Sequence, residues 1–123
     1  MVQKTILLVE DDQNQRDLYE EELIEEGYRV VTACDGRAAL KAVTDESPDL
    51  VIMDINMPVM DGLDSLSLMM EHSSHIPVII NSAYASYQDS FSSWSADAYI
   101  VKSSDLSELK QTVKKLLTKS DAN

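Results

Sequence analysis

Short apolar runs alternate with amphipathic segments along the whole chain, and this alternation predicts a mixed α/β fold. Five runs are rich in apolar and β-branched residues, which is typical of strands in the interior of a sheet. The predicted strands are Thr5–Val9, Tyr28–Ala33, Leu50–Met53, Ile76–Ile80 and Ala98–Val101. Because strands and helices alternate, we expect a parallel sheet with helices on both faces.

The segments between and after the strands carry apolar residues at helical spacing, so we expect five helices. The residues that set this spacing are Leu18, Tyr19, Leu23 and Ile24; Ala38, Ala39, Leu40, Ala42 and Val43; Leu63, Leu66, Met69 and Met70; Tyr84, Tyr87, Phe91 and Trp94; and Leu106, Leu109, Val113, Leu116 and Leu117. Asp12 or Asn14 is expected to cap the first helix, and Gly27 to end it. The polar residues 120–123 are expected to form a loose tail.

The length of 123 residues fits one domain with one core, so residues 1–123 are treated as a single domain. The pattern by itself does not order the strands. In a flavodoxin-like, doubly wound order of 2-1-3-4-5, the first and third strands would be neighbours. A binding crevice would then lie at the switch point between them.

The net charge of −12 makes the chain a poor non-specific binder of nucleic acid, because phosphate contacts need Lys and Arg. The acidic side chains either form a solvated surface or are partly gathered to hold a divalent cation. No apolar run approaches the ~18 residues of a membrane span, and residues 1–4 do not resemble a signal peptide. Cys34 is the only cysteine, which agrees with a reducing compartment and leads us to expect a cytoplasmic protein.

Polar residues stand at four predicted strand ends: Glu10-Asp11, Asp54, Ser82 and Lys102. In the flavodoxin-like order these ends would meet at one edge of the sheet, where ligands bind. Crowded carboxylates repel one another unless a cation lies between them. Mg²⁺ is usually bound by one or two carboxylates and keeps several water ligands. The Asp54 carboxylate could then attack a phosphoryl group, with Lys102 and the metal offsetting its charge. The Ser82 hydroxyl could donate to a phosphoryl oxygen.

Four sequence blocks carry a resemblance to a known family: VEDD at 9–12, DINMPVMDG at 54–62, NSA at 81–83 and DAYIVK at 97–102. Together they resemble the CheY-like receiver domain of two-component response regulators. The blocks stand in the family's order across nearly the whole chain. Each is weak alone, but the combination is specific.

The resemblance implies that Asp54 is the phospho-acceptor of a phosphorelay. It implies a magnesium site in which Asp11 binds directly, Glu10 binds through water, and the Asn56 backbone carbonyl is a further ligand. The implied phosphoryl donor is a phosphohistidine on a sensor histidine kinase or a phosphotransfer protein. Such a protein promotes its own phosphorylation and dephosphorylation and is not an enzyme in the ordinary sense.

The resemblance also implies a switch in which Ser82 and Lys102 contact the phosphoryl group. Ser82 is drawn inward and Tyr99 rotates, which changes a protein-binding surface. That surface would comprise the fourth and fifth helices and the fifth strand. A downstream protein, or a dimer formed on phosphorylation, would read it.

The chain departs from the family pattern at three places. Ser103 replaces the usual Pro after the lysine, which predicts a trans Lys102–Ser103 bond and a shifted loop. Trp94-Ser95 replaces a common Gly, so the surface there is unusual. The third is Tyr84, at a position that modulates loss of the phosphoryl group in this family, and Asn56 is implied to tune the same kinetics. We hypothesise that the Tyr84 ring shields the site from water.

Simpler interpretations exist for single residues, and two rival functions compete with a phosphorylated receiver. Ser82 alone would be a turn serine, Lys102 a surface lysine, and Tyr99 a packing residue of the strand. His72 and His75 are expected to be solvated, since no clear metal-binding partner accompanies them. One rival is a phosphatase of the haloacid dehalogenase type, whose DxDGT-like run is missing. The other is a phosphorylation-independent interaction module on a receiver fold.

Overall fold

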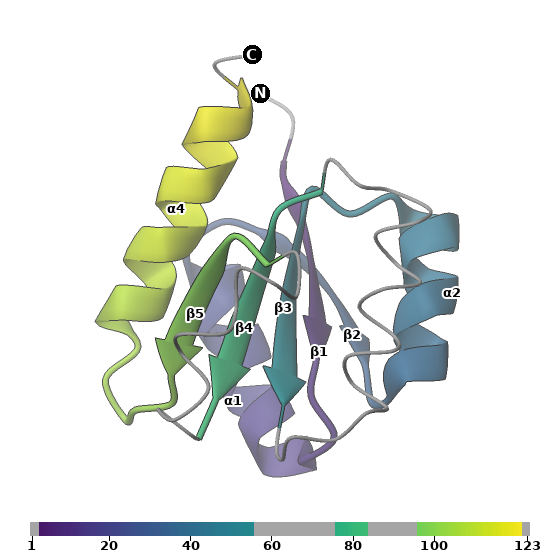
Figure 1. The fold of residues 1–123 in the computed structure, drawn as a ribbon, viewed down its shortest axis with the longest axis horizontal. Helices are drawn as coiled ribbons and strands as arrows, with labels where there is room; N and C mark the ends of the chain where they lie inside the picture. Colours follow the sequence, from purple (N-terminus) through teal and green to yellow (C-terminus); the bar gives the residue numbers. More distant parts are fainter. Residues whose placement is uncertain (1–2, 56–75, 84–95, 122–123) are drawn as a thin grey trace.

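Five parallel strands form the centre of the molecule in the computed structural model, which describes residues 3–55, 76–83 and 96–121. The strands are β1 (Thr5–Val9), β2 (Arg29–Ala33), β3 (Leu50–Ile55), β4 (Val78–Ser82) and β5 (Ala98–Val101). Their order is β2-β1-β3-β4-β5, so the flavodoxin-like fold expected from the sequence is confirmed. All the arrowheads in Figure 1 point to the same lower edge, where the carboxyl ends of the strands lie.

Helices cover both faces of this sheet, which explains why β1 is buried along its whole length. The described helices are α1 (Gln13–Glu25), α2 (Gly36–Glu46) and α4 (Ser107–Asp121), the last being the fifth helix predicted from the sequence. Side chains of α1 and α4 share one apolar cluster with β1, β3, β4 and β5, and those of α2 belong to a cluster on the opposite face. The predicted helices around 63–70 and 84–94 lie outside the described residues.

Side-chain hydrogen bonds explain where α1 and α2 begin, and left-handed backbone conformations mark where they end. The Asp12 carboxylate accepts the Gln15 N–H at 3.1 Å, and Asp35 accepts the Ala38 N–H at 2.8 Å, so each aspartate caps a helix. Gly27 follows α1 with a φ of 99°, a conformation that glycine adopts without strain. Ser47 follows α2 in the left-handed region, at φ 46° and ψ 60°.

β3 is longer than the sequence predicted, and β4 is shifted two residues along the chain from the predicted Ile76–Ile80. β3 continues through Asp54 to Ile55, because parallel pairing with β4 continues to the Ile55–Ser82 pair. Asp54 therefore lies inside a strand and not after one. β4 begins at Val78, after a proline that has no N–H to donate, and includes Asn81 and Ser82.

Two expectations about the helices were wrong in part. Tyr19 and Leu23 are buried as predicted, but Leu18 and Ile24 are 50% and 52% exposed. Each of these lies one position, about 100° around the helix, from the buried pair, so only part of the predicted stripe meets the core. α4 continues to Asp121, two residues into the expected loose tail.

The amino ends of two strands are fixed by aspartates that precede their neighbours. The Asp49 carboxylate accepts the Thr5 N–H at 2.8 Å, and the Asp97 carboxylate accepts the Val78 N–H at the same distance. Each bond connects adjacent strands where the ladder starts. Within the described residues no peptide bond is cis, so the trans bond predicted at Lys102 is confirmed, and no described helix could span a bilayer.

Candidate functional site

The register of the sheet brings polar residues from three strand ends together. Glu10 directly follows β1, Asp54 is the penultimate residue of β3, and Lys102 directly follows β5. Val9 pairs with Met53, which places Glu10 and Asp54 at the same level of the sheet. These residues therefore lie at the switch point expected between the first and third strands.

The Lys102 ammonium occupies the centre of this group. Its nitrogen lies 2.7 Å from Asp54 Oδ1 in an ion pair, and it donates hydrogen bonds to Glu10 Oε1 at 3.0 Å and Gln15 Oε1 at 2.6 Å. The Lys102 side chain is 12% exposed. Burial alone would lower the pKa of Lys102, but its contacts with Asp54 and Glu10 outweigh this effect and raise the pKa.

Glu10 is a fully buried carboxyl group held from several directions. Its Oε2 accepts the Asp12 N–H at 3.2 Å, and its backbone carbonyl accepts a bond from Arg16 Nη1 at 2.9 Å. Burial, with the contact and repulsion of Asp54, raises the pKa of Glu10 to about 7, although Lys102 acts in the opposite direction. Near neutral pH this site therefore holds less negative charge than its residue types suggest.

One carboxylate oxygen from each of Glu10, Asp11 and Asp54 lies within 4.8 Å of the others. The Asp54 side chain is 3% exposed, its Oδ1 is ion-paired with Lys102, and its Oδ2 has no hydrogen-bond donor among the described residues. A buried carboxylate with unused acceptor capacity beside two other acids is a suitable oxygen donor set for a hard divalent cation. The chemistry of these residues therefore fits Mg²⁺.

Ser82 and Tyr99 lie in the neighbouring strands. Ser82 is buried, pairs with Ile55, and accepts the Lys102 N–H on its backbone carbonyl at 2.6 Å. Tyr99 is 6% exposed and belongs to the core cluster on the face covered by α2. The structure thus attaches Ser82 to the lysine through the backbone and buries Tyr99 in β5.

Several residues considered in the sequence fall outside the described part of the chain: Asn56, His72, His75, Tyr84 and Trp94. Conversely, Gln15 and Arg16 contact the site but were not predicted to do so. No sequence signal marks them, since a glutamine in the first turn of a helix is ordinary. Their role follows only from the packing of α1 beside the ends of β1 and β5.

Comparison with known proteins agrees with this geometry. Residues 6–114 match the family described as response regulator receiver domain. The chain belongs to this receiver family. The matched range includes Glu10, Asp11, Asp54 and Lys102.

Curated relatives include both long and short proteins. The receiver is 38% identical over 114 residues to the transcriptional regulatory protein PrrA of Mycobacterium tuberculosis, covering 91% of this chain and 49% of that protein. It is 38% identical to sporulation initiation phosphotransferase F of Bacillus subtilis, covering 95% and 96% of the two chains. The chain therefore spans about half the length of the PrrA regulators and nearly all of the sporulation protein.

Solved structures resemble the receiver closely. The Thermotoga maritima response regulator TrrA in complex with Mg²⁺ and BeF has 45% identity and a TM-score of 0.84, covering 92% of this chain and 98% of that one. TrrA in complex with the histidine kinase ThkA gives 46% identity and a TM-score of 0.82, covering 93% and 98%. The family match from the sequence and the similarity to solved structures therefore both indicate a receiver domain.

Proposed function

We propose that this receiver is a phosphoacceptor switch in which Asp54 accepts a phosphoryl group. The observation that carries the proposal is the buried Asp54 carboxylate, whose Oδ1 is ion-paired with Lys102, whose Oδ2 has no donor among the described residues, and which lies beside two further acids. A carboxylate oxygen forms a bond to phosphorus while the P–N bond of a donor phosphohistidine breaks. The donor imidazole departs with the bonding electron pair.

The surrounding residues would stabilise the phosphoryl group in two ways, through a bound metal ion and through a lysine. Glu10, Asp11 and the backbone carbonyl of Asn56 would hold Mg²⁺ with Asp54, and the ion would neutralise charge on the phosphoryl oxygens. Lys102 supplies a fixed positive charge at the same place. The TrrA complex with Mg²⁺ and BeF supports this proposal.

Ser82 is the proposed switch hydroxyl, and Tyr99 is the proposed switch aromatic. Ser82 is bonded through its carbonyl to Lys102, and Ile80 pairs with Tyr99 two residues before Ser82. A change at the phosphoryl group therefore has a short covalent and hydrogen-bonded path to β5. Asn56 and Tyr84 are proposed to tune phosphoryl lifetime, and Tyr84→Ala should shorten it, as followed by loss of radiolabel.

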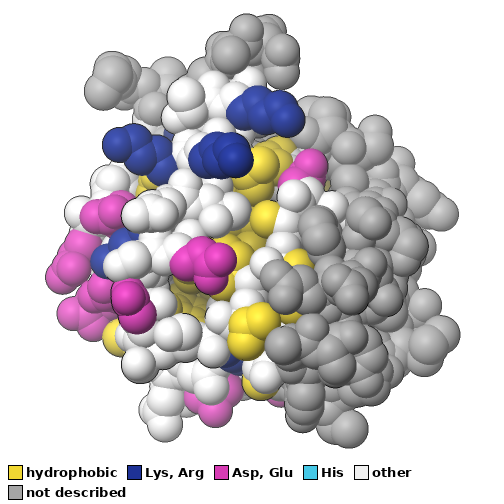
Figure 2. Space-filling view, turned by 60° about the vertical axis from the view of Figure 1, so that its left-hand side comes forward, with side chains coloured by type: hydrophobic (Ala, Val, Ile, Leu, Met, Phe, Trp, Pro, Cys, Tyr) yellow, Lys and Arg dark blue, Asp and Glu magenta, His cyan; other side chains and the backbone are white. Residues whose placement is uncertain are grey.

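The proposed partners are a kinase or phosphotransfer protein and a downstream protein. The TrrA complex with the histidine kinase ThkA supports the first, and we expect a cytoplasmic location accordingly. The proposed readout surface includes β5 and α4. Figure 2 shows dark-blue Lys and Arg side chains gathered near the top of the face that it turns forward, with acidic ones lower down. Alternatively, a second copy of the chain would bind this surface after phosphorylation and form a dimer.

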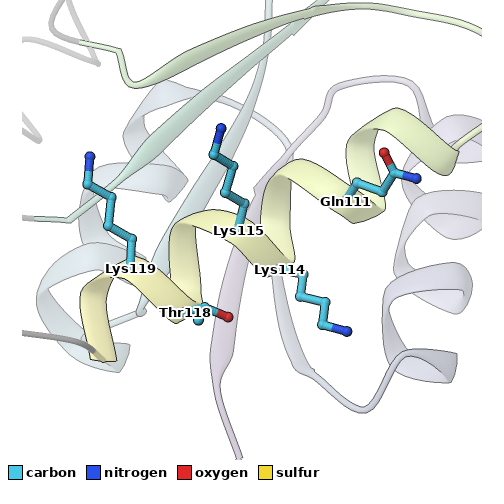
Figure 3. Close-up of a pocket in the computed structure, with 5 residues that line it drawn as sticks. All are labelled: Gln111, Lys114, Lys115, Thr118 and Lys119. Atoms are coloured by element: carbon cyan, nitrogen blue, oxygen red, sulfur yellow. The ribbon is translucent and has the colours of Figure 1, made fainter.

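The α4 part of this surface is unusually basic for so acidic a chain. Lys114, Lys115 and Lys119 line a shallow hollow with Gln111 and Thr118. Lys115 and Lys119 project to one side of the helix and Lys114 to the other (Figure 3). A downstream partner with acidic side chains would fit here, and Lys114→Gln with Lys115→Gln should weaken its binding.

Intact mass spectrometry with acetyl phosphate and Mg²⁺ tests the central proposal. We expect a gain of one phosphoryl group in the wild type and none in Asp54→Ala. Asp17→Ala, an exposed acid on α1, is the matched control and should be phosphorylated normally. A wild type that binds its partner but takes no phosphoryl group would instead indicate a phosphorylation-independent interaction module.

A further inference from the structure

Among the described residues, the Lys102 ammonium has as many oxygen neighbours as it has N–H donors. An ammonium group carries three donors, and the neighbours are Glu10 Oε1, Asp54 Oδ1 and Gln15 Oε1. The first two are carboxylate oxygens from the sheet. The third is a neutral amide oxygen from the first turn of α1, and at 2.6 Å it has the shortest separation of the three.

Gln15 belongs to a closed ring of hydrogen bonds around the site. Its backbone N–H donates to Asp12 Oδ1 at 3.1 Å, and the Asp12 N–H donates to Glu10 Oε2 at 3.2 Å. Glu10 Oε1 accepts from Lys102, which donates in turn to the Gln15 side chain. The cap of α1 and the lysine of the site therefore hold each other in place.

We propose that Gln15 is the positioning residue for Lys102, an inference that rests on the proposed function. The two carboxylates attract the ammonium towards the floor of the site, and the Gln15 oxygen holds it from the helix side. Because this oxygen is neutral, it directs the ammonium without adding a charge that would compete with a phosphoryl group. A neutral hydrogen bond is also weaker than one to a carboxylate, so this is the bond that Lys102 exchanges for a phosphoryl oxygen.

A purely structural role for Gln15 predicts a different result. If the amide only stabilised the start of α1, its loss would lower the free energy of unfolding and leave the Lys102 ammonium unchanged. The proposal instead requires Lys102 to become less protected when the amide oxygen is removed. The exchange rate of the Lys102 Nζ protons, followed by ¹⁵N NMR in metal-free protein, separates the two roles.

The variants follow from the geometry. Gln15→Leu keeps the size of the side chain without an acceptor, Gln15→Asn keeps the amide but shortens its reach, and Gln15→Glu keeps an oxygen at the same reach. Gln13→Leu is the matched control, since Gln13 is exposed in the same helical turn. The Lys102 signal is assigned by its loss in Lys102→Arg.

We expect the Lys102 Nζ protons to exchange about tenfold faster in Gln15→Leu and Gln15→Asn, and phosphorylation by acetyl phosphate to slow by about the same factor. Gln15→Glu should retain the protection. Unchanged exchange and phosphorylation in folded Gln15→Leu or Gln15→Asn would overturn the proposal. If wild-type Asp54 takes no phosphoryl group, the proposed function fails, while the NMR measurement still decides whether Gln15 positions Lys102.

Discussion

The ammonium of Lys102 lies 3.0 Å from the carboxylate of Glu10, a residue 92 positions earlier in the chain. Burying either charged group without a partner would cost free energy, because an unpaired charge is poorly solvated in a low-dielectric site. Asp54 completes the group as a second carboxylate at 2.7 Å from the same nitrogen. The site is therefore a compensated charge cluster, and changes in its charge should appear in stability as well as in phosphorylation.

Removing the positive charge should leave repelling carboxylates without compensation. We expect Lys102→Met to lower the free energy of unfolding of metal-free protein by about 3 kcal/mol at pH 7.5, as measured by urea denaturation. Part of the loss should be recovered at pH 5.5, where Glu10 is protonated. Lys115→Met removes an exposed lysine from α4 and should change stability by less than about 0.5 kcal/mol.

Glu10 should make stability depend on pH in an unusual direction. Its pKa is about 7 in the folded state and near 4.5 in its ordinary state, so the folded protein binds more protons between these values. Its contribution to stability is therefore fully present below pH 4.5 and is lost as the pH rises to 7. Glu10→Gln lacks this titration, so its stability relative to wild type should rise by on the order of 2 kcal/mol from pH 5 to 7.5. A constant difference across this range would contradict the raised pKa.

Mg²⁺ should bind more tightly as the pH rises, because the ion competes with the proton on Glu10. We expect affinity to increase from pH 6 to pH 8 and binding to release protons, as measured by calorimetry in two buffers of different ionisation enthalpy. Asp11→Asn should weaken binding at every pH, whereas the exposed acid variant Asp17→Asn should not. Equal affinity for wild type and Asp11→Asn would place the cation elsewhere.

Asp97 should matter for stability but not for phosphorylation. Its carboxylate accepts the Val78 N–H at 2.8 Å, and Asp97→Ala would leave this part-buried donor unpaired. The expected loss is about 2 kcal/mol in the free energy of unfolding, with an unchanged phosphorylation rate. Asp45→Ala, at an exposed position of α2, is the control and should be nearly neutral.

Ser47→Gly should stabilise the protein, because Ser47 adopts φ 46° and ψ 60°, a conformation that costs a non-glycine residue about 1 kcal/mol. We expect a net gain of roughly 0.5 kcal/mol in thermal unfolding, after the added flexibility of glycine in the unfolded chain. The opposite change, Gly27→Ala, places a side chain at φ 99° and should lose about 1 kcal/mol. A destabilised Ser47→Gly would show that the serine makes a contact outweighing its strain.

The sequence by itself determined the order and type of the described elements and the residues at the strand ends. Continuous apolar runs such as Leu50–Met53 are local signals, since a strand buried on both faces needs apolar residues at successive positions. The helix-ending residues Asp12 and Gly27 are also local signals, because a cap depends on residues within one turn of the helix. The family resemblance then supplied the expected roles of Asp54 and Lys102, which spacing alone left open.

Only the tertiary structure decided how the chemistry is arranged. The extension of β3 through Asp54 depends on pairing with β4, and the exposure of Leu18 depends on how α1 sits against the sheet. The contact of Gln15 with Lys102 joins residues 87 positions apart, which no local pattern encodes. Burial likewise raises the pKa of Glu10, because desolvation depends on all the surrounding elements at once.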